Sequence, residues 1–301
     1  MKSIIGFFII IFIIISPRLT SAQSEVNDCI NYFNAGNYGI AISVCEKAVR
    51  LYPKNLEAHL CLGKSYYQVG ELDKALKNMK DAERLVVRKD VLAAIYYNIG
   101  LIYDRKGELD NALFNYNKYL SLSRELKNKR GEAVALNNIA VIYDKKGMLD
   151  KALKYYELSL KLEYDEKGKN PIYNNIAAIY SKKGNHKKAV DYFKKAIEIG
   201  ERVEDYHGVA ITMLNLGDTY RIMKNYDKAL DMLNDGLKKI QKVGDKFWEA
   251  VAYEYLGLLY MDRGNKGFAK EYFTKAYTLY NSVGAKANAE NIILYLSSNK
   301  L

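Results

Sequence analysis

The sequence repeats one pattern of apolar and small residues between residues 62 and 269. A large apolar residue, a small residue, two variable residues and a tyrosine occur together six times. A glycine follows four residues after the tyrosine in five of the copies, and Lys224 takes its place in the other. An alanine lies five residues further on in all six. The copies begin at residues 62, 99, 139, 176, 216 and 256.

Each copy predicts two helices that pack closely. Large residues three or four positions apart, such as Ile99 and Tyr103, form one apolar stripe of the first helix, and Tyr116 and Tyr119 do the same in the second. A small residue such as Gly100 lets the second helix approach, and the later alanine is its counterpart. The glycine after the tyrosine favours the left-handed conformation that ends a helix. The pattern therefore predicts helix–turn–helix repeats.

A degenerate earlier copy near Cys29 brings the predicted number of repeats to seven. The small residues at 29, 63, 100, 140, 177, 217 and 257 lie 34 to 40 residues apart. Residues 285–297 fit one more helix, and we expect 284–301 to cap the array, because a last repeat would otherwise expose its apolar side. The predicted repeats lie near 22–55, 56–89, 93–126, 133–166, 170–203, 210–243 and 250–283.

This pattern resembles the tetratricopeptide repeat family, whose repeats carry a Leu-Gly pair, a tyrosine, and then an alanine and an aromatic residue in a second helix. The spacing is similar to the forty-residue branch of that family, found in kinesin light chain and in bacterial peptide-responsive regulators. The resemblance implies an all-α, right-handed α-solenoid of about seven helix pairs plus a C-terminal capping helix. It also implies that the first helix of each pair lines a concave groove.

The N-terminal segment predicts a signal peptide. A basic start is followed by an almost unbroken apolar run from Ile4 to Ile15, and the small residues Thr20 and Ala22 precede a cleavage site before Gln23. An uncleaved anchor is the alternative, but twelve residues span only about 18 Å as a helix, against roughly 30 Å of hydrocarbon. We expect residues 1–22 to be removed and the chain to be exported, to the periplasm or outside the cell.

Composition narrows the class of protein. Apolar residues make up 49% and charged residues 27% of the chain, which excludes a disordered chain and a multi-span membrane protein. The formal charge is +11, and it becomes +9 without Lys2 and Arg18. Nucleic-acid binding is one interpretation of this charge. Lysines that cap helix ends and maintain solubility are the favoured one, since aromatic and basic residues do not alternate. We expect no nucleic-acid partner and a mild preference for acidic ones.

The sequence carries no recognisable catalytic centre. Its three histidines fall in different repeats, without the spacing of a metal site. No glycine-rich phosphate loop and no recognisable pair of carboxylates is present. We therefore expect no enzyme activity, no metal and no cofactor.

Three cysteines lie close to the N-terminus, each sixteen residues from the next: Cys29, Cys45 and Cys61. In a reducing compartment they would be small apolar residues of the core. In an exported chain, two of them could form a disulfide between adjacent helices. The spacing alone does not select the pair.

One polar column indicates a function. An asparagine directly precedes the apolar–small pair in four repeats, and in two of them a second asparagine comes before it. The resemblance places this column on the concave wall, where amides can bind the backbone of an extended peptide. Alternatively, the amides bond between neighbouring repeats. The column comprises Asn98, Asn138, Asn175 and Asn215, with Asn137 and Asn174 before two of them.

We predict a non-enzymatic scaffold that binds a protein or an extended peptide in the groove. Lys145, Lys182 and Arg221 lie on the same predicted face and would add charged contacts. Two other classes stay open: a sensory or regulatory module that acts through a separate signalling partner, and a structural component of a cell-envelope assembly.

Overall fold

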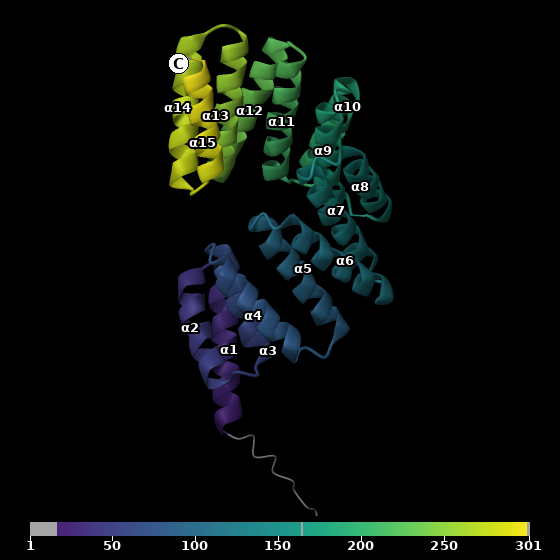
Figure 1. Cartoon of the computed structure of the whole chain (residues 1–301), viewed down its shortest axis with the longest axis vertical. Helices are drawn as coiled ribbons and strands as arrows, with labels where there is room; N and C mark the ends of the chain where they lie inside the picture. The colour runs from purple at the N-terminus through teal and green to yellow at the C-terminus, as the bar shows by residue number, and fades with distance from the viewer. Residues whose placement is uncertain (1–16, 164, 300–301) are drawn as a thin grey trace, which may run out of the picture. The chain divides into compact units, whose positions relative to one another are not determined.

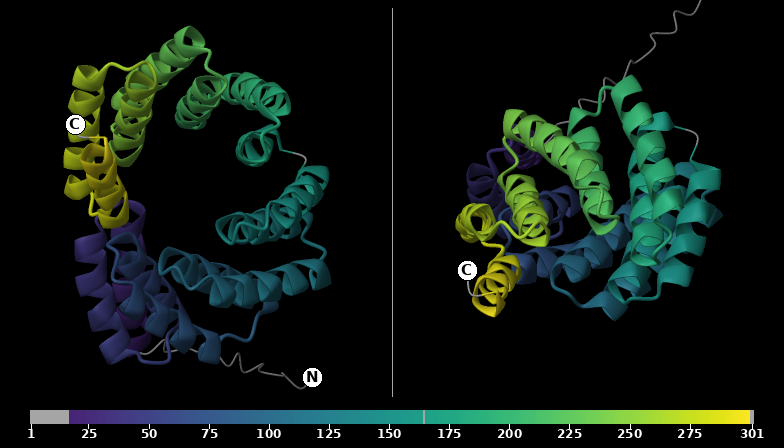
Figure 2. Two further views of the ribbon diagram at one scale, coloured as in Figure 1. Left: turned by 45° about the horizontal axis from the view of Figure 1, so that its top comes forward. Right: turned by 90° about the horizontal axis from the view of Figure 1, so that it is seen from above.

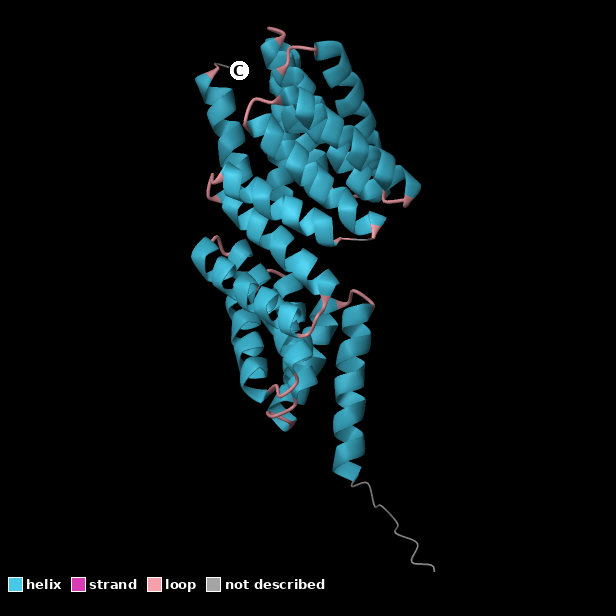
Figure 3. Ribbon diagram, turned by 90° about the vertical axis from the view of Figure 1, so that its right-hand side faces the viewer, coloured by secondary structure: helices cyan, strands magenta, loops and turns pink. Residues whose placement is uncertain are grey.

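The computed structural model describes residues 17–163 and 165–299, which form fifteen α-helices and no strand (Figure 1, Figure 3). The predicted all-α fold is confirmed. The apolar run of the predicted signal peptide lies outside the described residues. Among the described helices, none is both long and apolar enough to cross a bilayer.

The chain divides into two compact units, and we call Met1–Leu126 the N-terminal unit and Lys127–Leu301 the C-terminal unit. In the N-terminal unit three pairs of adjacent helices are described. The pairs are α1 (Pro17–Asn34) with α2 (Tyr38–Leu51), α3 (Leu56–Gln68) with α4 (Leu72–Leu85), and α5 (Lys89–Arg105) with α6 (Leu109–Glu125).

The C-terminal unit contains four pairs and one further helix in its described part. The predicted seven pairs plus a C-terminal helix are thus confirmed for the described chain. Its helices are α7 (Lys129–Lys145), α8 (Leu149–Leu162), α9 (Glu166–Lys182), α10 (His186–Arg202), α11 (Tyr206–Ile222), α12 (Tyr226–Val243), α13 (Lys246–Asp262), α14 (Lys266–Ser282) and α15 (Lys286–Ser298).

In the C-terminal unit the helix pairs begin about one turn before the predicted repeats, whereas α3 begins at residue 56 as expected. In the C-terminal unit α7, α9, α11 and α13 start at residues 129, 166, 206 and 246, whereas the repeats were expected from 133, 170, 210 and 250. The recurring pattern lies further along each first helix and contains no signal for the residue at which the helix begins.

Small residues hold the two helices of a pair close together. A Cβ atom on Gly100 would lie 2.5 Å from Cε1 of Tyr116, and one on Gly257 would lie 2.7 Å from Cδ1 of Phe273. Ala152 and Ala189, in the second helices α8 and α10, are fully buried. Each pair therefore packs at a distance that a larger residue at these positions would not allow.

The turn at Lys224 has the same backbone conformation as the turns that contain glycine. Lys224 has φ of +60°, close to the +71° and +76° of Gly147 and Gly107. Its backbone N–H donates to the Arg221 carbonyl at 2.8 Å, as Gly147 does to Asp144. The departure from the repeated pattern thus leaves the helix end intact, although a non-glycine residue in this region is strained.

Within each unit the first helices of successive pairs contact one another, except α7 and α9, which have no contact of similar extent. In the C-terminal unit α9 contacts α11 and α11 contacts α13, while second helices of the described chain have no contacts of similar extent with one another. The helices of this unit can be followed from teal through green to yellow in Figure 2. We call the surface of α7, α9, α11 and α13 that faces away from the second helices the inner face. It is the wall on which the asparagine column was predicted.

Candidate peptide-binding face

The C-terminal half of the asparagine column forms a bond between helices. Asn215 on α11 donates from Nδ2 to Oδ1 of Asn174 on α9, at 3.1 Å. Asn138 on α7 donates from Nδ2 to the Val134 carbonyl of its own helix, at 2.9 Å. Bonding between neighbouring repeats, the alternative role of the column, therefore occurs between α9 and α11.

The equivalent bond is missing one repeat earlier. Asn175 stands where the next repeat has Asn215, yet its side chain makes no hydrogen bond within the described residues. Asn137 stands where the next repeat has Asn174, and its Oδ1 is buried without a partner in the described structure. A buried acceptor without a partner costs about 1–3 kcal/mol. The half-buried Asn175 amide is therefore open to a ligand, and Asn137 is an unsatisfied acceptor beside it.

Asn98, the remaining member of the column, belongs to the N-terminal unit. Its Nδ2 donates to the Ala94 carbonyl within α5, at 2.6 Å. In the same unit Arg105 joins α5 to α3, because it donates to the Tyr67 carbonyl at 2.6 Å and lies over the Tyr67 ring.

The predicted cations of the inner face are engaged by carboxylates. Lys182 on α9 donates to both carboxylate oxygens of Asp144 on α7, each at 2.7 Å. Arg221 on α11 binds Asp218 at 2.7 Å and Asp262 on α13 at 2.6 Å. Ion pairs therefore connect the first helices of successive repeats. Lys145, the third predicted cation, also interacts within the protein.

A hollow of about 170 Å³ opens between α9, α11 and α13, with Phe193 of α10 also in its lining. Burial raises the pKa of the Asp218 carboxyl, and the Arg221 guanidinium beside it offsets this only in part. Burial and, to a smaller extent, the charge of Asp218 raise the pKa of Glu254, while a hydrogen bond from Tyr280 at 2.6 Å lowers it. The lining includes Ala178, Phe193, Asn215, Asp218, Ile222 and Tyr255.

Sequence analysis did not single out Tyr255 as a site residue. It occupies the position at which the preceding repeat carries Asn215, so it ends the asparagine column. This replacement is the signal that marks the last repeat as different. Without the structure, it does not reveal that the ring borders a hollow.

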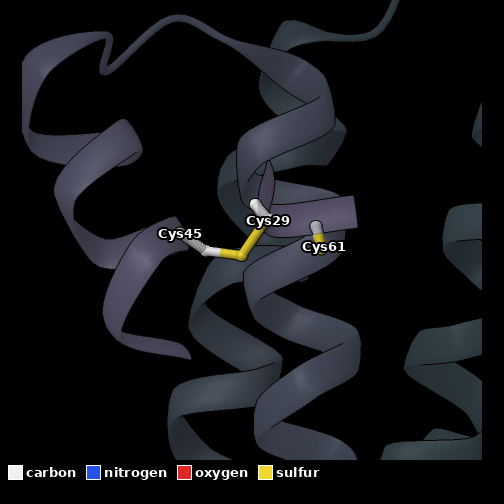
Figure 4. Close-up of side chains that lie close together, drawn as sticks. All are labelled: Cys29, Cys45 and Cys61. Carbon is white, nitrogen blue, oxygen red and sulfur yellow. A yellow bond between two sulfur atoms is a disulfide. The ribbon is translucent and has the colours of Figure 1, made fainter. Parts of the chain in front are cut away.

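The three cysteines lie together in the N-terminal unit (Figure 4). Cys29 of α1 and Cys45 of α2 form a disulfide, with Cα atoms 5.2 Å apart, and Cys61 of α3 is a buried free thiol. The three sulfur atoms lie within 4.8 Å of one another. Burial raises the pKa of the Cys61 thiol to about 11, which keeps it protonated. The structure thus selects one of the three possible pairs.

Thiol counting checks this pairing. In the unfolded chain without reductant we expect one reactive thiol, from Cys61, and three after reduction. The folded chain should react slowly, because Cys61 is only 6% exposed. Three reactive thiols in the unreduced, unfolded chain would show that Cys29 and Cys45 are not bonded.

Comparison with known proteins agrees with the repeat pattern. Two models of the tetratricopeptide repeat match the sequence, one over residues 91–162 and 170–242 and the other over residues 30–85. No well-characterised protein matches the sequence significantly.

Several solved structures share the fold. The apo form of RapI has a TM-score of 0.74 and 16% identity, over 88% of this chain and 99% of that one. The apo form of the quorum sensor NprR from B. thuringiensis has a TM-score of 0.69 and 17% identity, over 95% and 88%. A Rap protein complexed with Competence and Sporulation Factor has a TM-score of 0.65 and 15% identity, over 94% and 98%. The predicted α-solenoid is confirmed by these likenesses.

Proposed function

The chain belongs to the tetratricopeptide repeat family, and we propose that it is a non-enzymatic scaffold that binds a protein or an extended peptide along the inner face of the C-terminal unit. The Rap protein crystallised with Competence and Sporulation Factor supports binding of a partner by this fold. In the proposed complex, side-chain amides of α7 and α9 bind the peptide backbone, as a row of half-buried amides can.

The proposal rests on two asparagine side chains, one on α7 and one on α9, whose amide groups have atoms without a hydrogen-bond partner in the described structure. Asn137 Oδ1 has no partner among the described residues, although it is buried. Asn175, one repeat further along, makes no side-chain hydrogen bond there either. If the Asn137 side chain turns toward the inner face, a peptide N–H would satisfy an acceptor that the folded chain leaves unpaired.

A displayed library of random peptides, selected on the immobilised chain, tests this function. We expect enrichment of peptides that bind the free chain in calorimetric titrations and compete with one another for one site. Failure to enrich any peptide, or enrichment of peptides that bind without mutual competition, would contradict a single peptide groove.

An acidic ligand is not part of this proposal. The lysine and arginine side chains that would attract one are engaged: Lys182 by Asp144, and Arg221 by Asp218 and Asp262. A ligand carboxylate would have to displace these partners. The chemical character of the ligand is therefore better inferred from the carboxylates of the inner face.

We also propose that the chain is exported after cleavage before Gln23. The signal-peptide pattern and the Cys29–Cys45 disulfide support this proposal, because disulfides persist in oxidising compartments. Cleavage there would remove residues 17–22 from the start of α1 and leave Gln23–Asn34 in place.

Mass spectrometry of the chain expressed with its own N-terminus in a bacterial host checks the export proposal. In the periplasmic and secreted fractions we expect an N-terminus at Gln23 or within a residue or two of it. Ile9→Arg interrupts the apolar run and should leave the chain uncleaved inside the cell. Recovery of intact Met1 outside the cytoplasm would overturn cleavage.

A further inference from the structure

The hollow between α9, α11 and α13 has apolar walls and a carboxylate. Ala178, Ile222 and the Tyr255 ring supply apolar surface, and Asp218 contributes its carboxyl group. Its volume of about 170 Å³ is below the ~300–1,000 Å³ of a pocket for a whole small molecule. The hollow therefore suits one long side chain.

The charge around the hollow is negative. Asp218 and Asp262 share a single guanidinium, that of Arg221. Glu254 adds a third carboxylate, which accepts a hydrogen bond from the neutral Tyr280 hydroxyl and lies close enough to Asp218 for the two charges to interact. Lys182 also borders the hollow, but Asp144 neutralises it. Of these groups only Asp218 and Lys182 line the hollow itself. With the charged partners beside it, four carboxylates lie on or near the hollow against two cations.

We propose that this hollow is a specificity pocket for one basic side chain, lysine or arginine, of a bound peptide. The inference rests on the proposed peptide-binding function and names the chemistry that the ligand must carry. The aliphatic stem of the side chain would pack on Tyr255, Ile222 and Ala178. The cationic head would meet Asp218 and reduce the excess of negative charge, in a charge-assisted hydrogen bond.

The position of the hollow fits this role. Asn215 borders it, so it lies directly beside the amide column that would bind the peptide backbone. A peptide that runs along α7, α9 and α11 can therefore place successive residues on the asparagines and then one side chain in the hollow. Hydrogen bonds from the asparagines to the peptide backbone give affinity without sequence preference. The hollow would supply the preference for one kind of side chain.

A positional-scanning peptide library tests the pocket without a known ligand. Each pool fixes one position as lysine, arginine, norleucine or glutamate and randomises the others, and binding is measured by fluorescence polarisation. At one position we expect lysine and arginine pools to bind roughly tenfold or more tightly than the norleucine pool, because a hydrogen bond to a charged group is worth about 1.5–3 kcal/mol. The glutamate pool should bind most weakly.

Two variants test whether the hollow causes the preference for a basic residue. Asp218→Asn keeps the size of the side chain and leaves Arg221 paired with Asp262, so the ratio of lysine to norleucine binding should fall to about one. Ala178→Leu narrows the hollow without changing any charge, so the ratio of lysine to norleucine binding should again fall to about one. Asp231→Asn, a matched change at an exposed site on α12, should leave it unchanged. The ratio is measured within each variant, so a general loss of folded protein does not alter it.

The outcomes separate this inference from the proposed function. If pools bind but no position prefers a basic residue, or if Asp218→Asn and Ala178→Leu both keep the preference, the pocket is wrong and the peptide groove stands. If no pool binds the wild-type chain, the peptide groove itself is contradicted, and the pocket with it.

Discussion

Replacing Asn138 and Asn175 together by alanine is expected to weaken peptide binding roughly five- to a hundredfold. Both residues lie on first helices of successive repeats, α7 and α9, so an extended peptide must pass both. The Asn138 Nδ2 group is bonded to Val134, which leaves its Oδ1 as the acceptor for a peptide N–H. Two hydrogen bonds at about 0.5–1.5 kcal/mol each give this range. Calorimetric titration with a library-selected peptide measures it.

Asn281→Ala provides a matched control for the double variant. Asn281 is exposed on the second helix α14, and its Nδ2 donates to the Tyr277 carbonyl within that helix, as Asn138 does to Val134. The two changes therefore remove the same intrahelical bond on different surfaces. Full affinity in Asn138→Ala/Asn175→Ala would transfer the binding site to the outer helices, and equal losses in the control would indicate a general effect on the fold.

Ala152→Leu and Ala189→Leu are each expected to destabilise the folded chain by about 1–3 kcal/mol or more. Both alanines are completely buried in the second helices α8 and α10, within clusters that include Tyr156 and Phe193 respectively. A leucine there would have to push two packed helices apart. For a unit of this size, each kcal/mol lowers the melting temperature by about 2–4 °C.

Calorimetric melting and hydrogen exchange together check this prediction. Because each pair packs mainly on its neighbours, the loss of exchange protection should extend from the altered pair to the adjacent pairs before it reaches α15. Ala287→Leu, at an exposed position of α15, should change the melting temperature little. Unchanged melting in both buried variants would mean that these alanines do not mark the close approach of two helices.

The fold was predictable because its signal recurs. Six copies of one pattern fix the small residues at which helices approach, and Gly100 and Gly257 do contact large rings of their partner helices. Such contacts depend on the local sequence of one helix pair. The sequence alone therefore predicts the helix pairs, their order and the C-terminal helix.

The candidate site was only partly predictable, because it depends on side chains from several repeats. The sequence places Lys182 and Arg221 on one face, but their pairing with Asp144 and with Asp262 depends on distances between helices about forty residues apart in sequence. Equal spacing of the three cysteines likewise gives no preference for one pair. Only the packing of α1 against α2 brings Cys29 to Cys45.

The disulfide between α1 and α2 restrains local unfolding at the first helix pair of the array. It closes a loop over a sequence separation of sixteen residues, and a cross-link of this length stabilises by about 3 kcal/mol. In the described structure no disulfide holds α15, which buries Ala289 and Ile292 and accepts a hydrogen bond from Lys266 at the Asn299 carbonyl. Reduction therefore removes the restraint that ties α1 to α2 and lets the first helix detach more easily. The redox state of the surroundings thus decides how readily α1 opens and becomes accessible to proteases.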